Sequence, residues 1–472
     1  MLNSGFFTND TICAIATPQG MGAIATIRIS GPRTFTVVSS LFRQHGQPFD
    51  ATKMVSHKAY HGIIIEGETM LDEVLVTFFR APHSFTGENS AEISVHGSVH
   101  IQQKLLQLLI AHGCRMAEAG EFTRRAFVSG KFDLAQAEAI ADLISSESEA
   151  AHRVAINQLK GGFSKELQVL RSKLLEMTSL MELELDFSEE DVEFADRSQL
   201  MLLLEETIAH VTSLKDSFRL GNAIKNGIPV AIVGRTNTGK STLLNALLGE
   251  ERAIVSDIAG TTRDTIEETL NIEGLLYRFI DTAGLRETDE TIEKIGIERS
   301  YRKINEASII IGMLDGASPY ESMLFSAQEI ASRADLAHQQ LFLCINKVDV
   351  LDNNGEALLD QLQQDMDNDS IGFICLSAKH RLGLNTLFDA LKNSQPLTHS
   401  DVTLVTNARH YEALTRASES LNHVQEGLEM NIPTDLISQN LREALYYLGS
   451  ITGEITTDEV LGTIFSRFCV GK

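Results

Sequence analysis

The sequence is poor in cysteine and has no long hydrophobic run, and each shortage excludes a class of protein. Its five cysteines contain no Cys-x-x-Cys pair, so neither a zinc site nor a disulfide framework is indicated. No apolar run approaches the roughly 18 residues of a membrane-spanning helix, and residues 1–11 lack the basic and apolar layout of a signal peptide. We therefore expect a cytoplasmic protein without a membrane partner.

Basic residues are also scarce. The 472 residues include 40 Lys and Arg against 64 Asp and Glu, which gives a net charge of −24. This charge argues against binding nucleic acid through a general electrostatic footprint, so any RNA contact must be local or shared with a partner. The length suggests about three domains of roughly 150 residues each. Hydrophobic residues make up 43% of the chain, which is enough for well-packed cores.

The strongest chemical signal is the motif Gly-x-x-x-x-Gly-Lys-Ser at residues 234–241. A strand-like run, 230–233, precedes it and a helical run, 242–248, follows, which is the order that a nucleoside triphosphate site requires. The glycines let backbone N–H groups close on phosphate oxygens, and the helix N-terminus adds partial positive charge. We expect Lys240 to contact the β and γ phosphates and Ser241 to bind Mg²⁺.

Two further motifs follow strand-like runs and indicate which nucleotide is bound. Asn346-Lys-Val-Asp349 offers the Asp349 carboxylate to two guanine donors that adenine lacks, so this residue selects GTP over ATP. Ser377-Ala-Lys379 places the Ala378 N–H to contact the guanine carbonyl. A P-loop kinase is excluded, because it has no use for Asn-Lys-x-Asp.

Two other motifs supply groups around the γ phosphate. Asp281-Thr-Ala-Gly284 places a carboxylate that reaches Mg²⁺ through water and a Gly284 N–H that meets the γ phosphate, and Thr262 is a natural second hydroxyl for Mg²⁺. Ras-like enzymes have a water-orienting Gln directly after the Asp-x-x-Gly motif, whereas Leu285 stands there in this chain. The motifs together predict a GTPase whose hydrolysis is organised by some other group.

The periodicity of the sequence divides the chain into regions of different type. The first region alternates β-type runs (11–16, 23–29, 73–79 and 91–95) with turns and ends in a helix-like stretch, 101–111, which predicts an α/β domain with a mostly antiparallel sheet. A helical pattern follows, with apolar residues at steps of three and four: Leu167, Leu170, Leu174, Met177, Met181 and Leu185.

Helical patterning resumes after the GTPase segment, from Asn407 to the end, where Thr456-x-x-Glu459 predicts the cap of the last helix. We interpret the two helical regions as one domain split by an inserted domain. The predicted fold class is multi-domain α+β and α/β. Its domains are 1–131, an α/β domain; 132–224, the first part of a helical bundle; 225–398, an inserted Ras-like P-loop G domain; and 399–472, the second helical part with a Cys-x-Gly-Lys tail.

The sequence resembles the bacterial and organellar tRNA-modification GTPase family MnmE, also called TrmE, essentially from end to end. Besides the GTPase motifs, the resemblance is carried by Asp10-Thr-Ile, Ile27-Arg-Ile-Ser-Gly31, Ser84-Phe-Thr-Gly-Glu88, His96-Gly97, Gly120-Glu-Phe-Thr-Arg-Arg-Ala-Phe127, Lys131-x-Asp-Leu-Ala-Gln-Ala-Glu-Ala-Ile-Ala-Asp-Leu143 and Phe468-Cys-Val-Gly-Lys472. The tail is the most diagnostic piece, since ordinary GTPases have no reason to carry it.

The resemblance implies a folate-binding N-terminal domain, through which two subunits form a homodimer, beside a discontinuous helical domain and a G domain. It also implies an FAD-dependent partner, MnmG or GidA, in a heterotetramer or larger complex. Together the two proteins modify carbon 5 of the wobble uridine of certain tRNAs by aminomethyl or carboxymethylaminomethyl addition. The one-carbon unit is thought to come from 5,10-methylene- or 5-formyl-tetrahydrofolate.

Position by position, the resemblance assigns folate binding to Arg28, Glu92, Lys131 and Lys472. A carboxylate such as Glu92 can accept from the aminopyrimidine edge of a pterin, and cations can hold the carboxylates of folate. The residues alone leave other interpretations open: Arg28 and Lys131 as surface charges, and Glu92 as the partner of a neighbouring arginine. Cys469 matches the near-terminal cysteine of the family, and it remains open whether its thiol attacks uracil or supports the site.

The resemblance also explains the missing glutamine. In the family, a K⁺ ion beside the phosphates stands in for an arginine finger and the G domains dimerise across it; the matching ligands are Asn237, Ser256, Ile258 and Thr261. Glu293 matches the acid that positions water, although a solvated helix residue is the alternative. The full set expected to bind GTP is Asn237, Thr238, Gly239, Lys240, Ser241, Thr242, Ser256, Asp257, Ile258, Ala259, Gly260, Thr261, Thr262, Asp281, Thr282, Ala283, Gly284, Asn346, Lys347, Asp349, Ser377, Ala378 and Lys379.

Two functions of other classes remain as alternatives. The first is a ribosome-assembly or RNA-binding timer GTPase without modification chemistry, which a second G domain or a KH-type Gly-x-x-Gly module would favour; the sequence has neither. The second is a dynamin-like assembly protein, which requires basic, lipid-facing helices. The acidic charge of the chain opposes it.

Overall fold

The structure is a computed structural model that describes residues 10–50, 53–186, 197–249, 268–280, 304–394, 403–430, 432–466, 468 and 470–471. The chain divides into two compact units: unit 1 holds residues 1–141, 158–207 and 419–472, and unit 2 holds 142–157 and 208–418. The chain passes from one unit to the other within α4 (Leu134–Ser145), α5 (Glu149–Leu159), α7 (Arg197–Asp216) and α15 (Ala408–Glu429). The four-part division predicted from the sequence is finer and stays a prediction.

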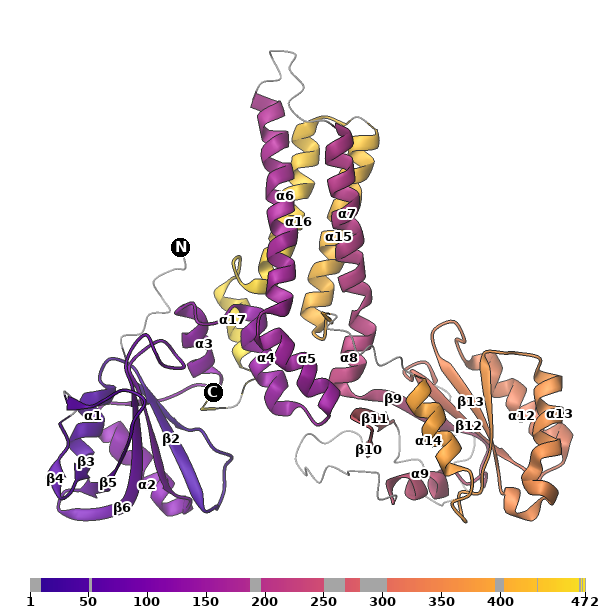
Figure 1. The fold of residues 1–472 in the computed structure, drawn as a ribbon, viewed down its shortest axis with the longest axis horizontal. Coiled ribbons are helices and arrows are strands. Elements are labelled where there is room, and N and C mark those ends of the chain that lie inside the picture. Colours follow the sequence, from indigo (N-terminus) through magenta and orange to yellow (C-terminus); the bar gives the residue numbers. More distant parts are fainter. Residues whose placement is uncertain are drawn as a thin grey trace. The chain divides into compact units, whose positions relative to one another are not determined.

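Unit 1 begins with an eight-stranded sheet in the order β4-β3-β5-β6-β7-β2-β1-β8 (Figure 1). The strands are β1 (Ile12–Ile15), β2 (Ile24–Ser30), β3 (Phe42–Gln44), β4 (Gln47–Pro48), β5 (Ala59–Glu66), β6 (Thr69–Phe79), β7 (Ser90–His96) and β8 (Arg115–Met116). Neighbours pair antiparallel except β1 and β8, which are parallel. The predicted mostly antiparallel α/β domain is thus confirmed.

Buried apolar side chains alternate with less buried ones along β2, and this alternation shows which face of the sheet the helices cover. In β2, Ala25, Ile27 and Ile29 are buried in one core with the apolar sides of α1 (Thr34–Leu41) and α2 (Val99–Ala111). Because successive side chains point to opposite faces, Arg28 of β2 lies on the face away from these helices. Glu92 of β7 stands directly opposite Arg28 in the pairing of the two strands and lies on the same face of the sheet.

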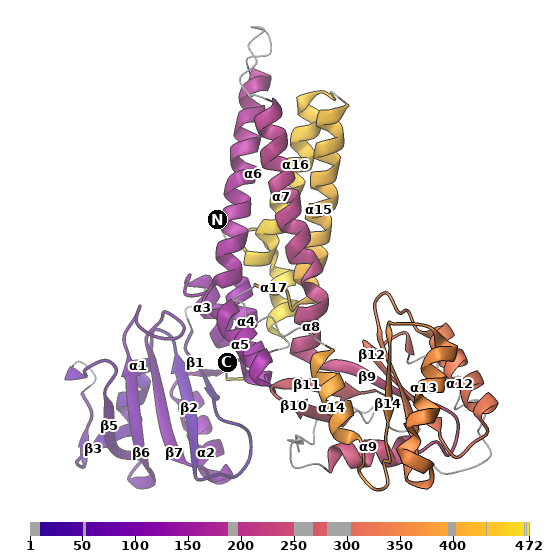
Figure 2. The ribbon, with the colours of Figure 1, turned by 45° about the vertical axis from the view of Figure 1, so that its right-hand side comes forward.

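The helices of unit 1 follow the predicted apolar stripe. Leu167, Leu170, Leu174, Met177 and Met181 of α6 (Gly162–Asp186) are all buried, and α6 packs along α16 (Thr434–Thr452), as both views show (Figure 2). A smaller core joins α3 (Glu121–Val128) and α4 to α17 (Asp458–Phe465). Among the helices that the structure describes, none combines the length and apolar character needed to cross a membrane.

Unit 2 contains a six-stranded sheet in the order β10-β11-β9-β12-β13-β14. Its strands are β9 (Ile228–Val233), β10 (Glu268–Ile272), β11 (Leu275–Phe279), β12 (Ile309–Asp315), β13 (Gln340–Asn346) and β14 (Ile371–Cys375). All neighbours are parallel except β10, which forms an antiparallel hairpin with β11. The parallel strands read as near-continuous apolar runs, which is typical of a sheet covered on both faces.

Helices cover both faces of this sheet. On one face α9 (Lys240–Leu248), α14 (Leu384–Asn393), α8 (Phe218–Asn226) and the start of α5 share a core, and on the other face lie α12 (Tyr320–Arg333) and α13 (Glu356–Met366). The arrangement is a doubly wound α/β fold, in which ligands bind beyond the carboxyl ends of the strands. The motifs at residues 234–241, 346–349 and 377–379 all follow such strand ends.

Candidate functional site

The loop between β9 and α9 holds the phosphate-binding motif in a conformation that favours glycine. Gly234 and Gly239 have φ angles of 151° and 96°, and Asn237 between them also has a positive φ, of 61°. A Cβ on Gly239 would lie 2.2 Å from the Nδ2 atom of Asn346, and one on Gly234 would lie 2.5 Å from the carbonyl oxygen of Met313. Both glycines are therefore required by close approach as well as by backbone conformation.

The lysine of the motif lies over this loop. Its Nζ donates to the carbonyl oxygens of Gly234 and Arg235 at 2.9 and 2.7 Å, and burial lowers the pKa of Lys240. Ser241 and Thr242 are exposed in the first turn of α9. A cation over a loop of inward-turned amides at a helix N-terminus fits a phosphate group, and the exposed hydroxyl beside it fits Mg²⁺.

Asn346, at the end of β13, joins two of the predicted motifs. Its side chain is 4% exposed; Nδ2 donates to the Thr238 carbonyl at 2.7 Å, and Oδ1 accepts from the Ala378 N–H at 3.0 Å. The phosphate loop and the Ser-Ala-Lys loop are therefore tied to one amide. In this structure the Ala378 N–H, predicted to contact the guanine carbonyl, is engaged with Asn346.

Asp349 lies beside this junction in a 3₁₀ turn, Val348–Val350. Its Oδ1 accepts from the Ser377 hydroxyl at 2.5 Å and its Oδ2 lies 3.6 Å from His380 Nε2. The hydrogen bond from Ser377 lowers the pKa of Asp349, so the carboxylate is kept as an acceptor, which is what the guanine donors require. Lys347 forms an ion pair with Asp315 at 2.7 Å and has a positive φ of 66°.

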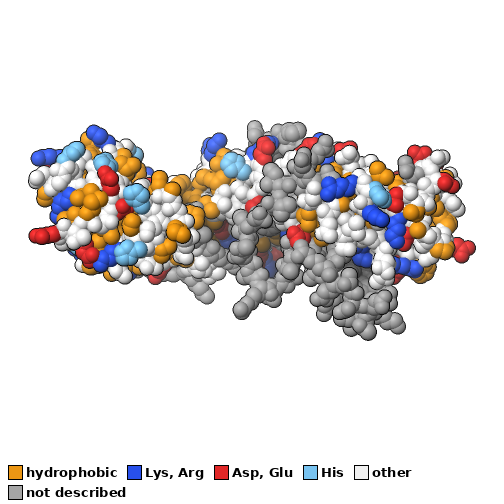
Figure 3. Space-filling view, turned by 90° about the horizontal axis from the view of Figure 1, so that it is seen from below, with side chains coloured by type: hydrophobic (Ala, Val, Ile, Leu, Met, Phe, Trp, Pro, Cys, Tyr) orange, Lys and Arg blue, Asp and Glu red, His pale blue; other side chains and the backbone are white. Residues whose placement is uncertain are grey.

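Basic side chains lie close together at the surface. Figure 3 shows, toward its right-hand end, several Lys and Arg side chains with a histidine beside them. In the sequence, Lys379, His380 and Arg381 come directly after Ala378 and are all exposed. In a chain of net charge −24, a local group of cations suits a polyanionic ligand such as a nucleotide.

Part of the predicted site lies outside the described residues, and for it the sequence-based assignments stay predictions. These residues are Ser256, Asp257, Ile258, Ala259, Gly260, Thr261, Thr262, Asp281, Thr282, Ala283, Gly284, Glu293, Cys469 and Lys472. Of the predicted metal ligands, Ser241 and Asn237 are described, and both are exposed. Within the described part of the chain, no group of three or more His, Cys, Asp or Glu side chains is arranged to hold a metal.

Two of the predicted folate-binding residues pair with each other. Arg28 Nε and Nη2 lie 3.0 and 2.9 Å from Oε1 of Glu92, and their side chains remain 21% and 32% exposed. The structure thus shows the arginine pairing that the sequence left open for Glu92. Because the pair is accessible, its carboxylate and guanidinium still offer the acceptors and donors that a pterin edge and a folate carboxylate need.

Aromatic rings and the chain end surround this pair. The guanidinium carbon of Arg28 lies 5.2 Å from the ring centre of Phe85 and 5.7 Å from that of Phe122. Its Nη1 donates to the Gly471 carbonyl at 3.4 Å, and Val470 forms an antiparallel bridge with Ala119. Two described residues of the tail, Val470 and Gly471, are therefore tied to Ala119 and Arg28.

Lys131, the third described candidate, lies beside the loop that carries Phe85. A Cβ on Gly87 of that loop would lie 3.7 Å from Cε of Lys131, and the rings of Phe85 and Phe132 are 5.9 Å apart. Lys131 is exposed. Arg28 and Lys131 thus both lie near one loop, residues 84–88, and Glu92 is joined to Arg28.

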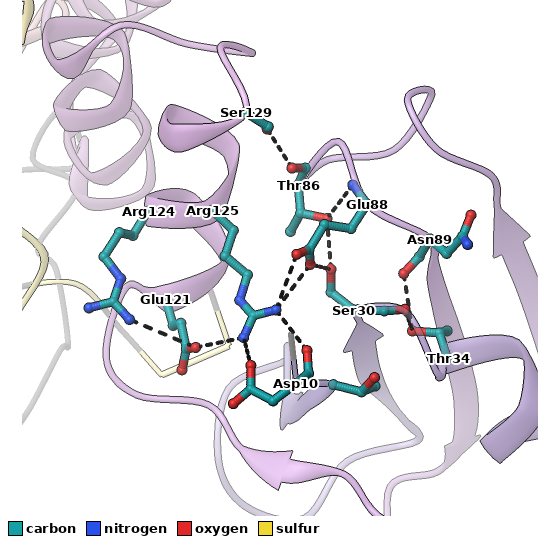
Figure 4. A network of polar contacts seen from close by, with 12 residues as sticks. Asp10, Ser30, Thr34, Thr86, Glu88, Asn89, Glu121, Arg124, Arg125 and Ser129 are labelled. Atoms are coloured by element: carbon teal, nitrogen blue, oxygen red, sulfur yellow. Dashed lines mark hydrogen bonds and ion pairs between the residues drawn. The ribbon is translucent and has the colours of Figure 1, made fainter. Parts of the chain in front are cut away.

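An ionic network that the sequence did not assign to the site holds this loop in place (Figure 4). Arg125 of α3 contacts Asp10 at 2.6 Å, Glu121 at 2.9 Å and Glu88 at 3.2 Å, and Arg115 contacts Glu121 at 2.7 Å. Burial would raise the pKa of Glu121, but the hydrogen bonds from Arg115, the Glu118 N–H and Arg125 outweigh burial and lower it. The network connects α3, the start of β1 and the 84–88 loop, so it fixes where Phe122 and Phe85 stand.

A P-loop with its Asn-Lys-x-Asp and Ser-Ala-Lys motifs, at the strand ends of a doubly wound sheet, defines a P-loop GTPase. A family model described as the GTP-binding protein TrmE N-terminus matches residues 11–131, and one described as the MnmE helical domain matches residues 134–469. The chain belongs to the tRNA modification GTPase family MnmE.

Curated relatives agree over nearly the whole chain. The tRNA modification GTPase MnmE of Bacteroides fragilis is 52% identical over 98% of this chain and 99% of its own length. The protein of the same name from Bacteroides thetaiotaomicron is 51% identical with the same coverage. A solved structure of Aquifex aeolicus Era is 27% identical and covers 41% of this chain and 66% of that chain, with a TM-score of 0.28, at which the likeness carries no weight for the fold.

Proposed function

We propose that this GTPase uses GTP hydrolysis to drive modification of carbon 5 of the wobble uridine of certain tRNAs, together with the FAD-dependent protein MnmG. The observation that carries the proposal is the Asn346 junction, which holds phosphate loop and base-binding loop together in a chain related to MnmE over 98% of its length. The proposed product carries an aminomethyl or carboxymethylaminomethyl group, and the chain acts in the cytoplasm.

In the proposed hydrolysis, the residues of the G domain bind GTP and Mg²⁺ and a K⁺ ion supplies the charge of the missing arginine finger. Ser241 and Thr262 would bind Mg²⁺, and Asp281 would reach it through water. Asn237 with Ser256, Ile258 and Thr261 would hold K⁺. A fixed cation beside the phosphates is favourable because negative charge builds on the oxygen between the β and γ phosphates. Support comes from Asn237, which is exposed in the phosphate loop with its backbone already turned to a positive φ of 61°.

In the proposed modification step, the folate derivative lies against the exposed Arg28–Glu92 pair, with Lys131 and Lys472 holding its carboxylates. The folate would supply a one-carbon unit, and Cys469 would act close to it. Support comes from the contacts of Arg28, which reach Glu92, the rings of Phe85 and Phe122, and the Gly471 carbonyl. A charged pair, two rings and the chain end offer polar and stacking contacts together, which suits a flat heterocycle with a charged tail.

The proposed assembly is a homodimer through the N-terminal domains, bound to MnmG in a heterotetramer or larger complex that acts on tRNA. The charge of the chain supports a shared tRNA site, since a net charge of −24 repels a polyanion unless a partner supplies cations. Two G domains that meet only around the bound K⁺ would make hydrolysis depend on that ion, because such a cycle needs different affinities for two states.

The first test is the steady-state rate of GTP hydrolysis of the purified protein in K⁺ and in Na⁺ at matched ionic strength. We expect K⁺ to accelerate hydrolysis and Asn237→Ala to remove that gain. Asn245→Ala is a matched control, since Asn245 is an exposed asparagine on α9 outside the phosphate loop. Equal slow rates in both salts would contradict the cation-driven cycle and would favour a timer GTPase that a partner activates.

A further inference from the structure

The hairpin of β10 and β11 is bound to the first turn of α5 by hydrogen bonds. The Ala150 N–H donates to the Gly274 carbonyl at the hairpin tip over 3.1 Å. The side chain of Asn271 donates through Nδ2 to the Glu147 carbonyl, just before α5, over 3.4 Å. All four residues belong to unit 2, so the contact lies within one compact body.

The same asparagine also shapes the tip of the hairpin. Its Oδ1 accepts from the Gly274 N–H at 2.9 Å, and Gly274 has a φ of 86°. A Cβ on Gly274 would lie 3.3 Å from Cβ of Glu149, so the tip approaches α5 closely. One side chain therefore sets the turn through its acceptor and holds the helix through its donor.

Apolar contacts lie beneath these hydrogen bonds. Ala151 of α5 is 8% exposed and shares a core with Leu270 of β10 and Leu275 of β11, and Val154 packs against the same core. Glu273, also at the tip, forms an ion pair with Lys392 of α14 at 2.6 Å. The hairpin is thus fixed between α5 and α14, and a displacement of its strands cannot leave the start of α5 unaffected.

The hairpin that contacts α5 lies between two segments predicted to bind the nucleotide. β10 begins at Glu268, shortly after Thr262, and β11 ends at Phe279, two residues before Asp281. Thr262 is proposed to bind Mg²⁺ and Asp281 to reach it through water. The first turns of α5 lie in residues 142–157, which belong to unit 2 although the chain continues into unit 1 at both ends.

We propose that Asn271 is a positioning residue that couples the nucleotide state of the G domain to the part of the chain that carries out modification. The inference rests on the proposed function, because it assumes that hydrolysis drives modification. In this arrangement the hairpin moves with the segments at its two ends, and its tip carries the first turn of α5 with it. Coupling requires that the contact differ between two states.

Two substitutions separate the roles of the side chain. Asn271→Asp keeps an acceptor for the Gly274 N–H but has no donor for the Glu147 carbonyl. It therefore preserves the turn and removes the side-chain hydrogen bond from the hairpin to the start of α5. Asn271→Ala removes both. Asn226→Ala is the matched control, because Asn226 is an exposed asparagine of the same unit whose side chain donates to Asn222 within α8.

Two measurements on the full-length protein read the coupling. Hydrogen exchange of the Ala150 amide is compared between the GDP-bound protein and the protein with a non-hydrolysable GTP analogue. Modified tRNA formed per GTP hydrolysed is measured in the reconstituted reaction with MnmG. Coupling between two binding sites usually changes an affinity by about 5- to 150-fold. Taking the lower end of that range as a guide, we expect Asn271→Asp to lower the yield of modified tRNA per GTP by at least about fivefold, while GTP hydrolysis by the isolated protein stays close to wild type.

The possible outcomes distinguish a failure of the coupling role of Asn271 from a failure of the proposed function on which it rests. The inference holds if exchange at Ala150 depends on the nucleotide in the wild type and in Asn226→Ala, and loses that dependence in Asn271→Asp together with the yield of modified tRNA. It is overturned if Asn271→Asp and Asn271→Ala keep the wild-type ratio of modified tRNA to hydrolysed GTP. If the wild type itself hydrolyses GTP without modifying tRNA, the proposed function fails instead.

Discussion

The side-chain amide of Asn346 donates to the Thr238 carbonyl over 2.7 Å. This bond ties the end of β13 to the turn of the phosphate loop. The same side chain accepts a hydrogen bond from the Ala378 N–H. A loop that binds phosphate and a loop that binds a base are otherwise independent surface segments. Here the two loops are tied to one buried residue, which sets the spacing between the two halves of the proposed nucleotide site.

Replacing Asn346 should therefore weaken GTP binding as well as the fold. Asn346→Ala leaves the Thr238 carbonyl and the Ala378 N–H without their partner, and unpaired buried groups cost about 1–3 kcal/mol each. We expect the dissociation constant for GTP, measured by calorimetry, to rise at least about tenfold, since 1.4 kcal/mol corresponds to a factor of ten. Asn346→Asp keeps an acceptor for the Ala378 N–H but turns a carboxylate oxygen toward the Thr238 carbonyl, so it should also raise the dissociation constant for GTP. Equal dissociation constants for wild type and both variants would contradict the role of Asn346 in joining the two loops.

Asp349→Asn tests the residue proposed to read the base. The substitution replaces a carboxylate, kept ionised by Ser377, with an amide that presents a donor to the guanine donors. Hydrogen bonds to charged groups contribute about 1.5–3 kcal/mol, so GTP should bind at least about tenfold more weakly and its preference over ATP should vanish. Competition binding with both nucleotides measures this, with a melting curve to show an intact fold and exposed Asp352→Asn as control. Unchanged GTP affinity would remove Asp349 from base recognition.

Much of this fold could be predicted because its signals are local. The phosphate loop shows its strand, glycines and helix within a single stretch, and the stripe on α6 shows its period over five turns. The last helix was predicted to be capped by Thr456, whereas the structure has Thr457 as N-cap, accepting from the Val460 N–H at 3.4 Å. Two adjacent threonines offer the same chemistry, so sequence alone could not choose between them.

The parts that could not be predicted depend on contacts between distant residues. β5 was missed, and its Gly62 is needed because a Cβ there would lie 2.6 Å from the ring of Phe42, which only the folded sheet reveals. The ionic network joins Asp10 to Arg125, 115 positions apart. Asp10, Glu88, Glu121 and Arg125 stand inside motifs that carry the family resemblance, but nothing in the spacing of those motifs says that their charges meet.

The buried carboxylate of that network gives a pH test. The pKa of Glu121 is lowered in the folded protein, so its contribution to stability is present above the unfolded value of about 4.3 and is lost as pH falls through the folded value. We expect Glu121→Gln to lower the free energy of unfolding by about 1.5–3 kcal/mol at pH 7, because hydrogen bonds to two arginines lose their charge.

This loss should shrink as the pH falls below about 4.3 toward the folded pKa, since the wild-type carboxylate then becomes neutral too. Urea unfolding at a series of pH values, followed by circular dichroism, measures it. Glu118→Gln is the control: its side chain is 68% exposed and lies 3.5 Å from Arg124, and exposed pairs contribute little. A pH-independent difference between wild type and Glu121→Gln would show that the cost comes from shape and not from charge.

The tail test separates the two proposed activities of the chain. Cys469→Ser and Cys469→Ala should leave GTP hydrolysis unchanged, because the contacts of the tail reach Arg28 and Ala119 of unit 1, and none of the described ones involves the phosphate loop. Modification of tRNA in the reconstituted reaction should be abolished by both if the thiolate forms a bond to uracil, since neither replacement is a comparable nucleophile. If the cysteine only supports the site, the serine variant should retain part of the activity that the alanine variant loses. Cys375→Ser, in β14 of unit 2, controls for the loss of a thiol elsewhere. Full modification by both tail variants would remove Cys469 from the reaction and leave the folate to deliver its carbon without a covalent intermediate on the protein.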